Sequence, residues 1–353
     1  MLVIMVRGIT TNLKFPFAGF ATNSITADFL YPIFWKAVSI LECSFKLKVL
    51  FCICDGASAN RKFFQLHKLD NSTEPVYFTK NPHDENCNLY FISDVPHLLK
   101  TAINCLSNLY SHKKTRQLWN REKDISWMHL VLLFEEHCEQ DIYSPCSKLS
   151  RPHIDLTAFT YMKVNLAAQI LSGTVANALE HFYDESVSET VCFIRHFNRF
   201  FDCLNVRSLF EGRNKRNPDL DPYTDVNDNR LEWLTTTFLG YFEEWRQNIE
   251  NRNIAATAKQ KAAMTLSRQT LDGLKISVKS ITECVKRQDP LEQHFGHYRH
   301  KSGANNNPTV YDVRNMMTTL RAVGSQALQP RKGNISVNRE NIPIDNTELP
   351  RRR

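Results

Sequence analysis

The hydrophobic pattern of this chain changes character between residues 110 and 120. Before that point, short apolar segments alternate with segments of helical periodicity, which is typical of an α/β fold. After it, apolar residues recur at helical spacing as far as residue 285, and no segment shows a convincing strand pattern. The sequence therefore predicts an α/β part followed by a largely helical part.

The first 110 residues predict four strands and three helices. The predicted strands are residues 2–6, 16–21, 48–54 and 88–93. The predicted helices are residues 24–43, a segment that begins near Ser58, and Pro96–Leu109. The last two strands are compact apolar runs that each stop at an aspartate, so a carboxylate lies at the end of each one.

The helical part carries four apolar stripes at a period of about 3.6 residues. They run over residues 162–179, 187–204, 231–249 and 271–285. This period is the usual signature of packing, so we interpret the stripes as core rather than as binding grooves. The polar segment 211–229 is predicted to be a loop, and the segment 326–353, which is poor in apolar residues, is predicted to be disordered.

Composition narrows the class of protein only in part. Lys and Arg number 44 against 37 Asp and Glu, and the net charge of +7 is compatible with a nucleic-acid partner and with many other functions. The ten cysteines form no Cys-x-x-Cys pair and several lie in apolar runs, which is typical of reduced thiols in a cytosolic or nuclear protein. The apolar run Leu2–Val6 is too short to span a membrane, so no membrane association is predicted.

Two aspartates at strand ends are candidate ligands for a divalent cation. Asp55 lies in CDGASANR, directly after the strand 48–54, and Asp94 lies in SDVPHLLK, directly after the strand 88–93. Ligands bind at the carboxyl ends of strands in α/β sheets, and carboxylate oxygens suit Mg²⁺. The alternative for Asp55 is a simple Asp-Gly turn, and the alternative for Asp94 is the cap of the helix that begins at Pro96.

A third group of acidic residues follows the last apolar stripe. Asp289 and Glu292 lie three residues apart in QDPLEQHFGHYR, at the expected start of a helix. Acidic residues are common in first helical turns, and that is the alternative interpretation. His294, His297 and His300 are also spaced by three, but successive three-residue steps drift around a helix, so we do not predict a zinc site there.

Several segments of the chain are similar to segments of the P-element transposases and of their domesticated THAP-protein relatives. They are CDGASANRKFF, SDVPHLLKT, KVNLAAQILS, FDCLN and QDPLEQHFGHYRHKSGANNNPT, in the family's order and with similar gaps. The resemblance covers the chain to about residue 325. It implies an RNase H-like core interrupted by a helical insertion that binds GTP, and it implies DNA as the partner. The implied location is nuclear, or cytoplasmic if a truncated form lacks an import signal, and a homo-oligomer is compatible with the family.

The resemblance also implies how the chain is divided. The first part of the RNase H-like core is expected at residues 1–112 and the helical GTP-binding insertion at residues 113–255. The closing part of the core, with Glu292 on its helix, is expected at residues 256–325, followed by the disordered tail at residues 326–353.

In that family an Asp–Asp–Glu set holds two metal ions, Mg²⁺ or Mn²⁺, for chemistry at phosphodiester bonds. Asp55 is similar in position to the second Asp and Glu292 to the Glu, so the resemblance implies that both are catalytic metal ligands. The residues that match positions contacting GTP are Lys148, Lys163, Val164, Ser172, Asp202 and Asp289. A conventional P-loop is excluded, because the pattern Gly-x-x-x-x-Gly-Lys-Ser/Thr does not occur.

The chain departs from the family's pattern at its beginning. The first Asp of the set should lie on the first strand of the core, but no acidic residue precedes Asp28, and the family's zinc-finger domain has no counterpart here. We therefore expect a core that lacks its first strand, from a truncated gene model or a decayed or domesticated element. Two-metal catalysis needs the full ligand set, so we expect that this chain alone does not cut DNA.

Three functions remain open from the sequence. A transposase catalytic core predicts Mg²⁺ binding and DNA binding that weakens steeply with salt. A domesticated regulatory protein predicts DNA and GTP binding without metal-dependent cleavage. A helical interaction module without a nucleotide predicts that neither Lys163→Ala nor Ser172→Ala changes any affinity.

Overall fold

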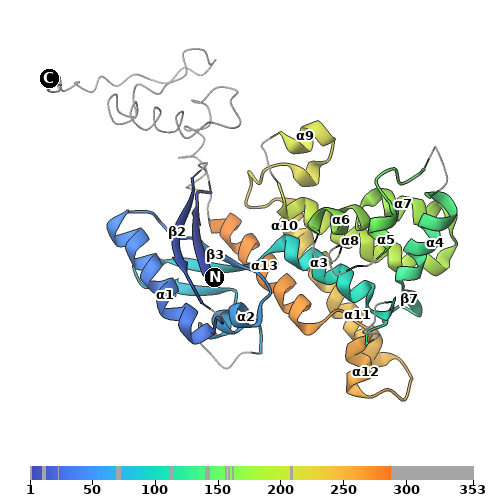
Figure 1. Cartoon of the computed structure of the whole chain (residues 1–353), viewed down its shortest axis with the longest axis horizontal. Helices are drawn as coiled ribbons and strands as arrows, with labels where there is room; N and C mark the ends of the chain where they lie inside the picture. Colours follow the sequence, from blue (N-terminus) through green and yellow to red (C-terminus); the bar gives the residue numbers. More distant parts are fainter. Residues whose placement is uncertain are drawn as a thin grey trace, which may run out of the picture. The chain divides into compact units, whose positions relative to one another are not determined.

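The computed structural model describes residues 2–9, 13–22, 24–68, 73–110, 115–139, 144–155, 157, 160, 163–206 and 210–287 (Figure 1). Asp289, Glu292, the three histidines that follow and the predicted tail lie outside these residues. The chain divides into two compact units, residues 1–6 with 15–290 and residues 7–14 with 291–353. The elements described below belong to the first unit, apart from the ends of the first two strands.

The first two strands form a sheet of their own. β1 (Leu2–Arg7) and β2 (Lys14–Phe20) are hydrogen-bonded neighbours, which confirms the two strands predicted there. Alternate residues of β1 are exposed, with Val3 at 44% and Met5 at 51%. β1 therefore turns one face inward, where Leu2 packs against the buried cluster that contains Phe63.

The second sheet positions the two aspartates. It consists of β3 (Phe51–Cys54), β4 (Phe78–Asn81) and β5 (Asp84–Ser93) in the order β3-β5-β4. β3 runs parallel to β5 with Cys54 opposite Ser93, and β4 runs antiparallel to β5. Because parallel strands end at the same edge of a sheet, Asp55 and Asp94 emerge side by side. β4 was not predicted, and β5 begins four residues before the predicted strand.

Two helices pack against this sheet. α1 (Ala27–Ser39) is capped by Thr26 and continues as the π-helix η1 (Ile40–Ser44), and α2 (Ser58–Gln65) follows β3, as predicted. Phe63 and Phe64 of α2 are each 2% exposed, and the Phe64 ring stacks on Phe91 of β5 with centroids 4.6 Å apart. These aromatic contacts form the centre of the α/β core.

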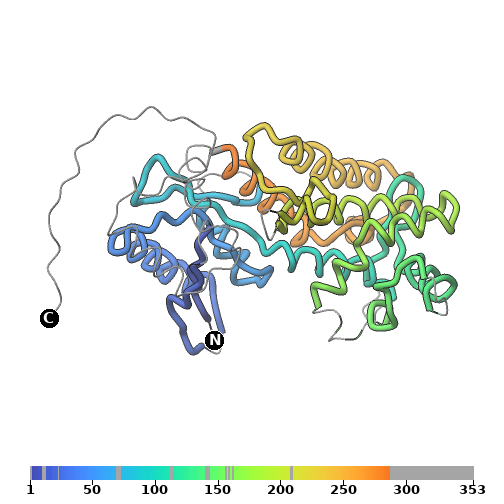
Figure 2. The backbone as a smooth tube through the Cα atoms, turned by 90° about the horizontal axis from the view of Figure 1, so that it is seen from above, coloured from blue at the N-terminus to red at the C-terminus, as the bar shows by residue number. Residues whose placement is uncertain are grey.

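Two further helices connect the sheet with the helical part. α3 (Val95–Leu106) leads away from β5, and α13 (Arg268–Arg287) returns to it (Figure 2). Ser277 Oγ of α13 donates to Ser93 O, and Ser280 Oγ donates to Tyr77 O, both at 2.8 Å. Because these serines bond to the backbone at the sheet, α13 is held there although Ser277 lies 184 positions after Ser93 in the sequence.

The elements between α3 and α13 are mostly helical. They are η2 (Asn108–Tyr110), β6 (Leu118–Asn120), β7 (Lys123–Ile125), α4 (Trp127–His137), α5 (Arg151–Ile154), α6 (Val164–Ile170), α7 (Gly173–Phe182), η4 (Glu185–Val187), α8 (Ser188–Leu204), α9 (Glu211–Lys215), η5 (Pro218–Leu220), α10 (Asn229–Trp233), η6 (Leu234–Phe238), α11 (Leu239–Asn251) and α12 (Ala258–Ala263). Phe193, Phe197 and Phe200 of α8 are fully buried against Phe238 and Trp245. The prediction that the apolar stripes form the hydrophobic core is therefore confirmed.

Three predictions for the helical part are wrong. The segment 211–229, predicted to be a loop, contains the helix α9 and the short 3-10 helix η5. β6 and β7 form an antiparallel hairpin where no strand was predicted, because each strand has three residues and the turn uses Arg121 and Glu122 at positive φ in place of glycine or asparagine. The stripe over residues 162–179 corresponds to two helices rather than one. Ser172 divides them because its hydroxyl caps α7 by accepting from the Val175 N–H at 3.4 Å.

Candidate functional site

Asp55 follows β3 and begins the turn into α2. Its Oδ1 atom accepts hydrogen bonds from the Ala57 N–H at 3.0 Å and from Asn60 Nδ2 at 2.7 Å. The side chain is exposed, and its Oδ2 atom has no hydrogen-bond partner among the described residues. The turn therefore orients the carboxylate and leaves one oxygen available, so a turn and a cation ligand are compatible interpretations.

Asp94 occupies the corresponding place at the end of β5. Its N–H donates to Cys54 O at 2.8 Å, and its Oδ2 atom accepts from the His97 N–H at 3.0 Å. Asp94 is thus the N-cap of α3, which confirms the capping alternative. His97 lies against the turn after β3, where a Cβ on Gly56 would come within 2.8 Å of its Nε2 atom, so a larger residue at position 56 would displace the imidazole.

Asp55 has the properties of a ligand for a hard divalent cation, because it offers an exposed carboxylate oxygen at the carboxyl end of a strand. Within the residues that the structure describes, no three His, Cys, Asp or Glu side chains lie close enough to hold a metal ion. Glu292, the expected second ligand, and Asp289 lie beyond Arg287, where the described chain ends. A metal centre at Asp55 therefore stays a prediction.

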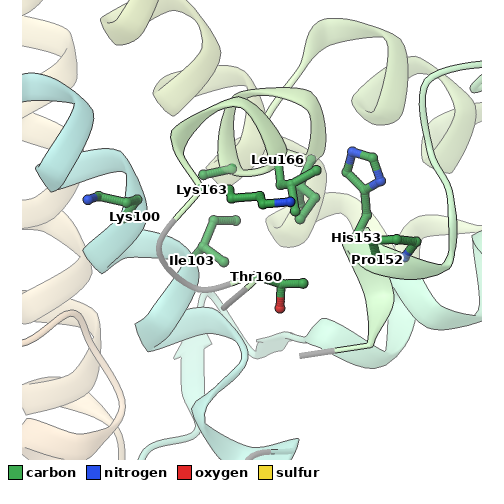
Figure 3. Close-up of a pocket in the computed structure, with 9 residues that line it drawn as sticks. Lys100, Ile103, Pro152, His153, Thr160, Lys163 and Leu166 are labelled. Atoms are coloured by element: carbon green, nitrogen blue, oxygen red, sulfur yellow. The ribbon is translucent and has the colours of Figure 1, made fainter. Parts of the chain in front are cut away.

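Lys163 and Val164 begin the first helix of the expected GTP site. Lys163 is the N-cap of α6, and its N–H donates to Thr160 O at 3.1 Å. Lys163 also lines a small cavity between α3, α5 and α6, with Lys100 on one side and His153 on the other (Figure 3). The cavity volume of about 10 Å³ is room for roughly one water molecule, so this cavity alone holds no nucleotide.

A chain of hydrogen bonds joins the start of α7, next to Ser172, to Asp202. Gly173, the residue after Ser172, donates its N–H to Asn198 Oδ1 of α8 at 3.1 Å. Asn198 Nδ2 then donates to Asp202 Oδ2 at 3.1 Å, and Asn217 Nδ2 donates to the same oxygen at 2.9 Å. The start of α7 and the carboxylate on α8 are thereby held together, although 30 residues separate Ser172 from Asp202 in the sequence.

Asp202 combines partial burial with an available oxygen. Burial raises the pKa of Asp202, and the hydrogen bonds from Asn217 and Asn198 act in the opposite direction. The Oδ1 atom has no hydrogen-bond partner among the described residues. A half-buried carboxylate with one free oxygen is a suitable acceptor for the N–H groups at the edge of a purine.

The structure thus brings together only some of the predicted nucleotide-contacting residues. Lys163 and Val164 are adjacent at the start of α6, and Ser172 and Asp202 are linked through Asn198. Lys148 lies exposed in the turn before α5, and no described contact joins it to the others.

Two polar residues of this network, Asn198 and Asn217, were not predicted from the sequence. Asn198 lies four residues before Asp202, a spacing that places both side chains on the same face of α8, so a signal for it was available. Asn217 comes from the segment between α9 and η5, and nothing in the sequence indicates that it reaches Asp202.

No helix within the described residues is both long enough and apolar enough to cross a membrane.

Comparisons with known proteins match both parts of the fold. Residues 1–68 match the family model of the TNP-like RNase H N-terminal domain, residues 96–217 that of the TNP-like GTP-binding insertion domain, and residues 288–312 that of the TNP-like RNase H C-terminal domain. The Transposable element P transposase of Drosophila melanogaster is 24% identical over 283 residues, which are 74% of this chain and 34% of that protein. The chain therefore spans about a third of the length of this curated relative.

A solved structure shows the same fold. The Drosophila P element transposase strand transfer complex is similar with a TM-score of 0.60 at 20% identity, over 93% of this chain and 71% of the other. An RNase H-like domain with a GTP-binding insertion is the class of protein that the fold and the matches define. The chain belongs to the P-element-type transposase family.

Proposed function

We propose that this chain is a transposase catalytic-core fragment whose natural substrate is DNA and whose insertion binds GTP. The observation that carries the proposal is Asp55, which the parallel pair β3 and β5 places at the carboxyl edge of an RNase H-like sheet. The reaction class is phosphoryl transfer at DNA phosphodiester bonds, the cut-and-paste chemistry of a transposase. Such a protein acts in the nucleus, which we propose as its location.

Asp55 and Glu292 are the two carboxylates that we assign to a divalent cation, Mg²⁺ or Mn²⁺. The bound cation would stabilise charge on a phosphate oxygen and activate a hydroxyl or water. The residues around Asp55 orient its carboxylate through the Ala57 N–H and Asn60 Nδ2. The assignment of Glu292 to the same cation rests on its similarity in position to the closing Glu of the family's Asp–Asp–Glu set, within the segment 288–312 that matches the RNase H C-terminal model.

Residues of the insertion have separate roles toward GTP in this proposal. Lys163 supplies positive charge for the phosphates at the start of α6, and Ser172 supplies a hydroxyl at the start of α7, where a helix dipole favours an anion. Asp202 accepts from the guanine N–H groups through its available oxygen. In this proposal Asp289 and Lys148 also contact the nucleotide, Lys148 from the turn before α5.

The chain by itself is expected not to cut DNA. Two-metal transfer uses three carboxylates in this family, and two of them, Asp55 and Glu292, are assigned in this chain. A second candidate function is a regulatory protein that binds DNA and GTP without cleavage. The two candidates share GTP and DNA binding and differ in whether Asp55 serves a reaction.

Titration with a fluorescent GTP analogue tests the nucleotide assignment. We expect Asp202→Asn and Lys163→Ala to weaken binding about 10- to 100-fold, since hydrogen bonds to charged groups contribute about 1.5–3 kcal/mol. Lys259→Ala, on the exposed side of α12, is the matched control and should bind as the unaltered chain does. Equal affinity for all variants, or no GTP binding by the unaltered chain, would refute the GTP site.

DNA assays separate the two candidates. Binding to a DNA duplex should weaken steeply as salt rises, because phosphate contacts release counterions. With Mg²⁺ or Mn²⁺ present, we expect no cleavage by the chain alone. Cleavage that disappears in Asp55→Asn would overturn the expected inactivity and identify Asp55 as catalytic, whereas cleavage that persists in Asp55→Asn would refute its role.

A further inference from the structure

Cys43, His83 and Ser39 form a row of contacts outside the site described above. Cys43 Sγ lies 3.6 Å from His83 Nδ1, and His83 Nε2 lies 2.8 Å from Ser39 Oγ. Ser39 and Cys43 are one turn apart, where α1 passes into the π-helix η1, and His83 lies in the turn between β4 and β5. Cys43 and His83 are both exposed, so reagents in solution reach the sulfur atom directly.

The turn that carries His83 is tied to the same helix. The His83 N–H donates to Asn81 Oδ1 at 2.9 Å, and Asn81 Nδ2 donates to Glu42 Oε1 of η1 at 2.8 Å. Asn81 is 1% exposed, so these bonds are shielded from water. His83 is therefore anchored to α1 through its ring, at Ser39, and to η1 through its backbone, by way of Asn81 and Glu42.

The orientation of the imidazole suits it to accept a proton from the thiol. When His83 Nε2–H donates to Ser39 Oγ, the Nδ1 atom carries the lone pair and faces the sulfur. A nucleophile beside a base that a third group orients is the arrangement by which proteins activate thiols. A π-helical turn at a reactive side chain is also a frequent feature of functional sites.

A second cysteine–histidine pair in the chain shows what this arrangement adds. Cys192 Sγ lies 3.5 Å from His196 Nδ1, almost the same distance, but that Nδ1 atom also lies 2.8 Å from Cys192 O. His196 Nδ1–H must therefore donate to the carbonyl, and it has no lone pair for the thiol. Burial raises the pKa of Cys192 to about 11, which further disfavours its thiolate.

We propose that Cys43 is a reactive thiol that hydroperoxides oxidise to sulfenic acid, with His83 as the proton acceptor. The thiol proton passes to His83 Nδ1 as the sulfur attacks one peroxide oxygen. The S–O bond forms and the O–O bond breaks, and the departing oxygen takes up the proton as water or an alcohol. The sulfur is oxidised by two electrons and the peroxide is reduced by two, so the step needs no other reactant.

The class of oxidant follows from the exposure of the pair. The sulfur and the imidazole lie at the surface rather than in a deep pocket, so a small uncharged reagent reaches them without being bound first. A hydroperoxide supplies its own leaving group, and its attack by sulfur depends on removal of the thiol proton. Base assistance by His83 should therefore be measurable as a rate.

Hydrogen peroxide with dimedone as the trap for sulfenic acid tests the proposal on the full 353-residue chain. Peptide mass spectrometry follows labelling at Cys43 and at Cys192 in the same sample. We expect Cys43 to be labelled at least about tenfold faster than Cys192, and His83→Gln to slow Cys43 by about tenfold. His83→Gln keeps the size of the side chain and removes the base, and labelling of Cys192 should be unchanged in it.

Ser39→Ala provides an independent variant, because it removes the partner that orients the ring and leaves the turn at His83 intact. We expect it to slow Cys43 severalfold, with an unchanged circular dichroism spectrum. Cys43 labelling no faster than Cys192 in the unaltered chain would overturn the proposal. So would equal Cys43 rates in the unaltered chain and in Ser39→Ala and His83→Gln.

Discussion

Gly273 of α13 shows how closely this helix approaches α3. A Cβ added at Gly273 would lie 2.6 Å from Leu98 Cδ2 and 3.4 Å from Ser93 Oγ. Leu98 is 3% exposed, so its methyl group has little room to move away. Gly273→Ala therefore overpacks the junction, which costs about 1–3 kcal/mol.

Gly240 of α11 is the matched control, because a Cβ there would have no atom within 4 Å. Both glycines lie inside helices, so each Gly→Ala change gains about 1 kcal/mol from helix propensity. This gain cancels when the two variants are compared. Their free energies of unfolding should thus differ by the cost of overpacking alone, about 1–3 kcal/mol in favour of Gly240→Ala.

Urea unfolding followed by far-ultraviolet circular dichroism measures both variants. We expect Gly240→Ala to raise the midpoint and Gly273→Ala to leave it unchanged or lower it. Equal stabilisation by the two substitutions would show that α13 does not pack on Leu98 as described.

Three other substitutions have expected outcomes in the same unfolding assay. Burial raises the pKa of Asp202, so the folded state is favoured when this carboxyl is protonated and loses that stability as pH rises through the folded pKa. Asp202→Asn removes the charge, so it should raise the urea midpoint at about pH 7 and have less effect at about pH 3. Arg230 is 7% exposed and pairs with Asp228 at 2.6 Å, so Arg230→Met should cost about 3–5 kcal/mol, whereas a cost below about 1 kcal/mol would indicate a solvent-screened pair. Trp245→Phe removes the bond from Nε1 to Trp119 O and should cost about 1–3 kcal/mol; an unchanged midpoint would contradict this.

Local sequence patterns predicted much of the framework. The strands β1, β2 and β3 and the helices α2, α8 and α13 lie close to the segments predicted from the apolar pattern. The same patterns placed Asp55 and Asp94 after strands, and the parallel pairing of β3 with β5 brings both to one edge. Only their hydrogen bonds distinguish the two residues: Asp55 keeps one available oxygen, whereas Asp94 caps a helix.

Elements with weak local signals were not predicted. β4 and the hairpin β6–β7 have three or four residues per strand, too few for alternation to be recognised. The hairpin turn at Arg121 and Glu122 lacks the residues that usually mark positive φ, so surrounding contacts must hold it. Arg121 pairs there with Glu244 at 2.8 Å, a residue of α11 far along the chain.

The sequence by itself determined that an α/β part precedes a mostly helical part, and that Asp55 lies at a strand end, because these features depend on the order and spacing of nearby side chains. Only the tertiary structure decided which polar groups meet. Asn217 reaches Asp202, and His83 reaches Cys43 across 40 positions, because the strands and helices that carry them pack together. Such contacts depend on how distant segments bury their apolar faces against each other, and no local spacing records that.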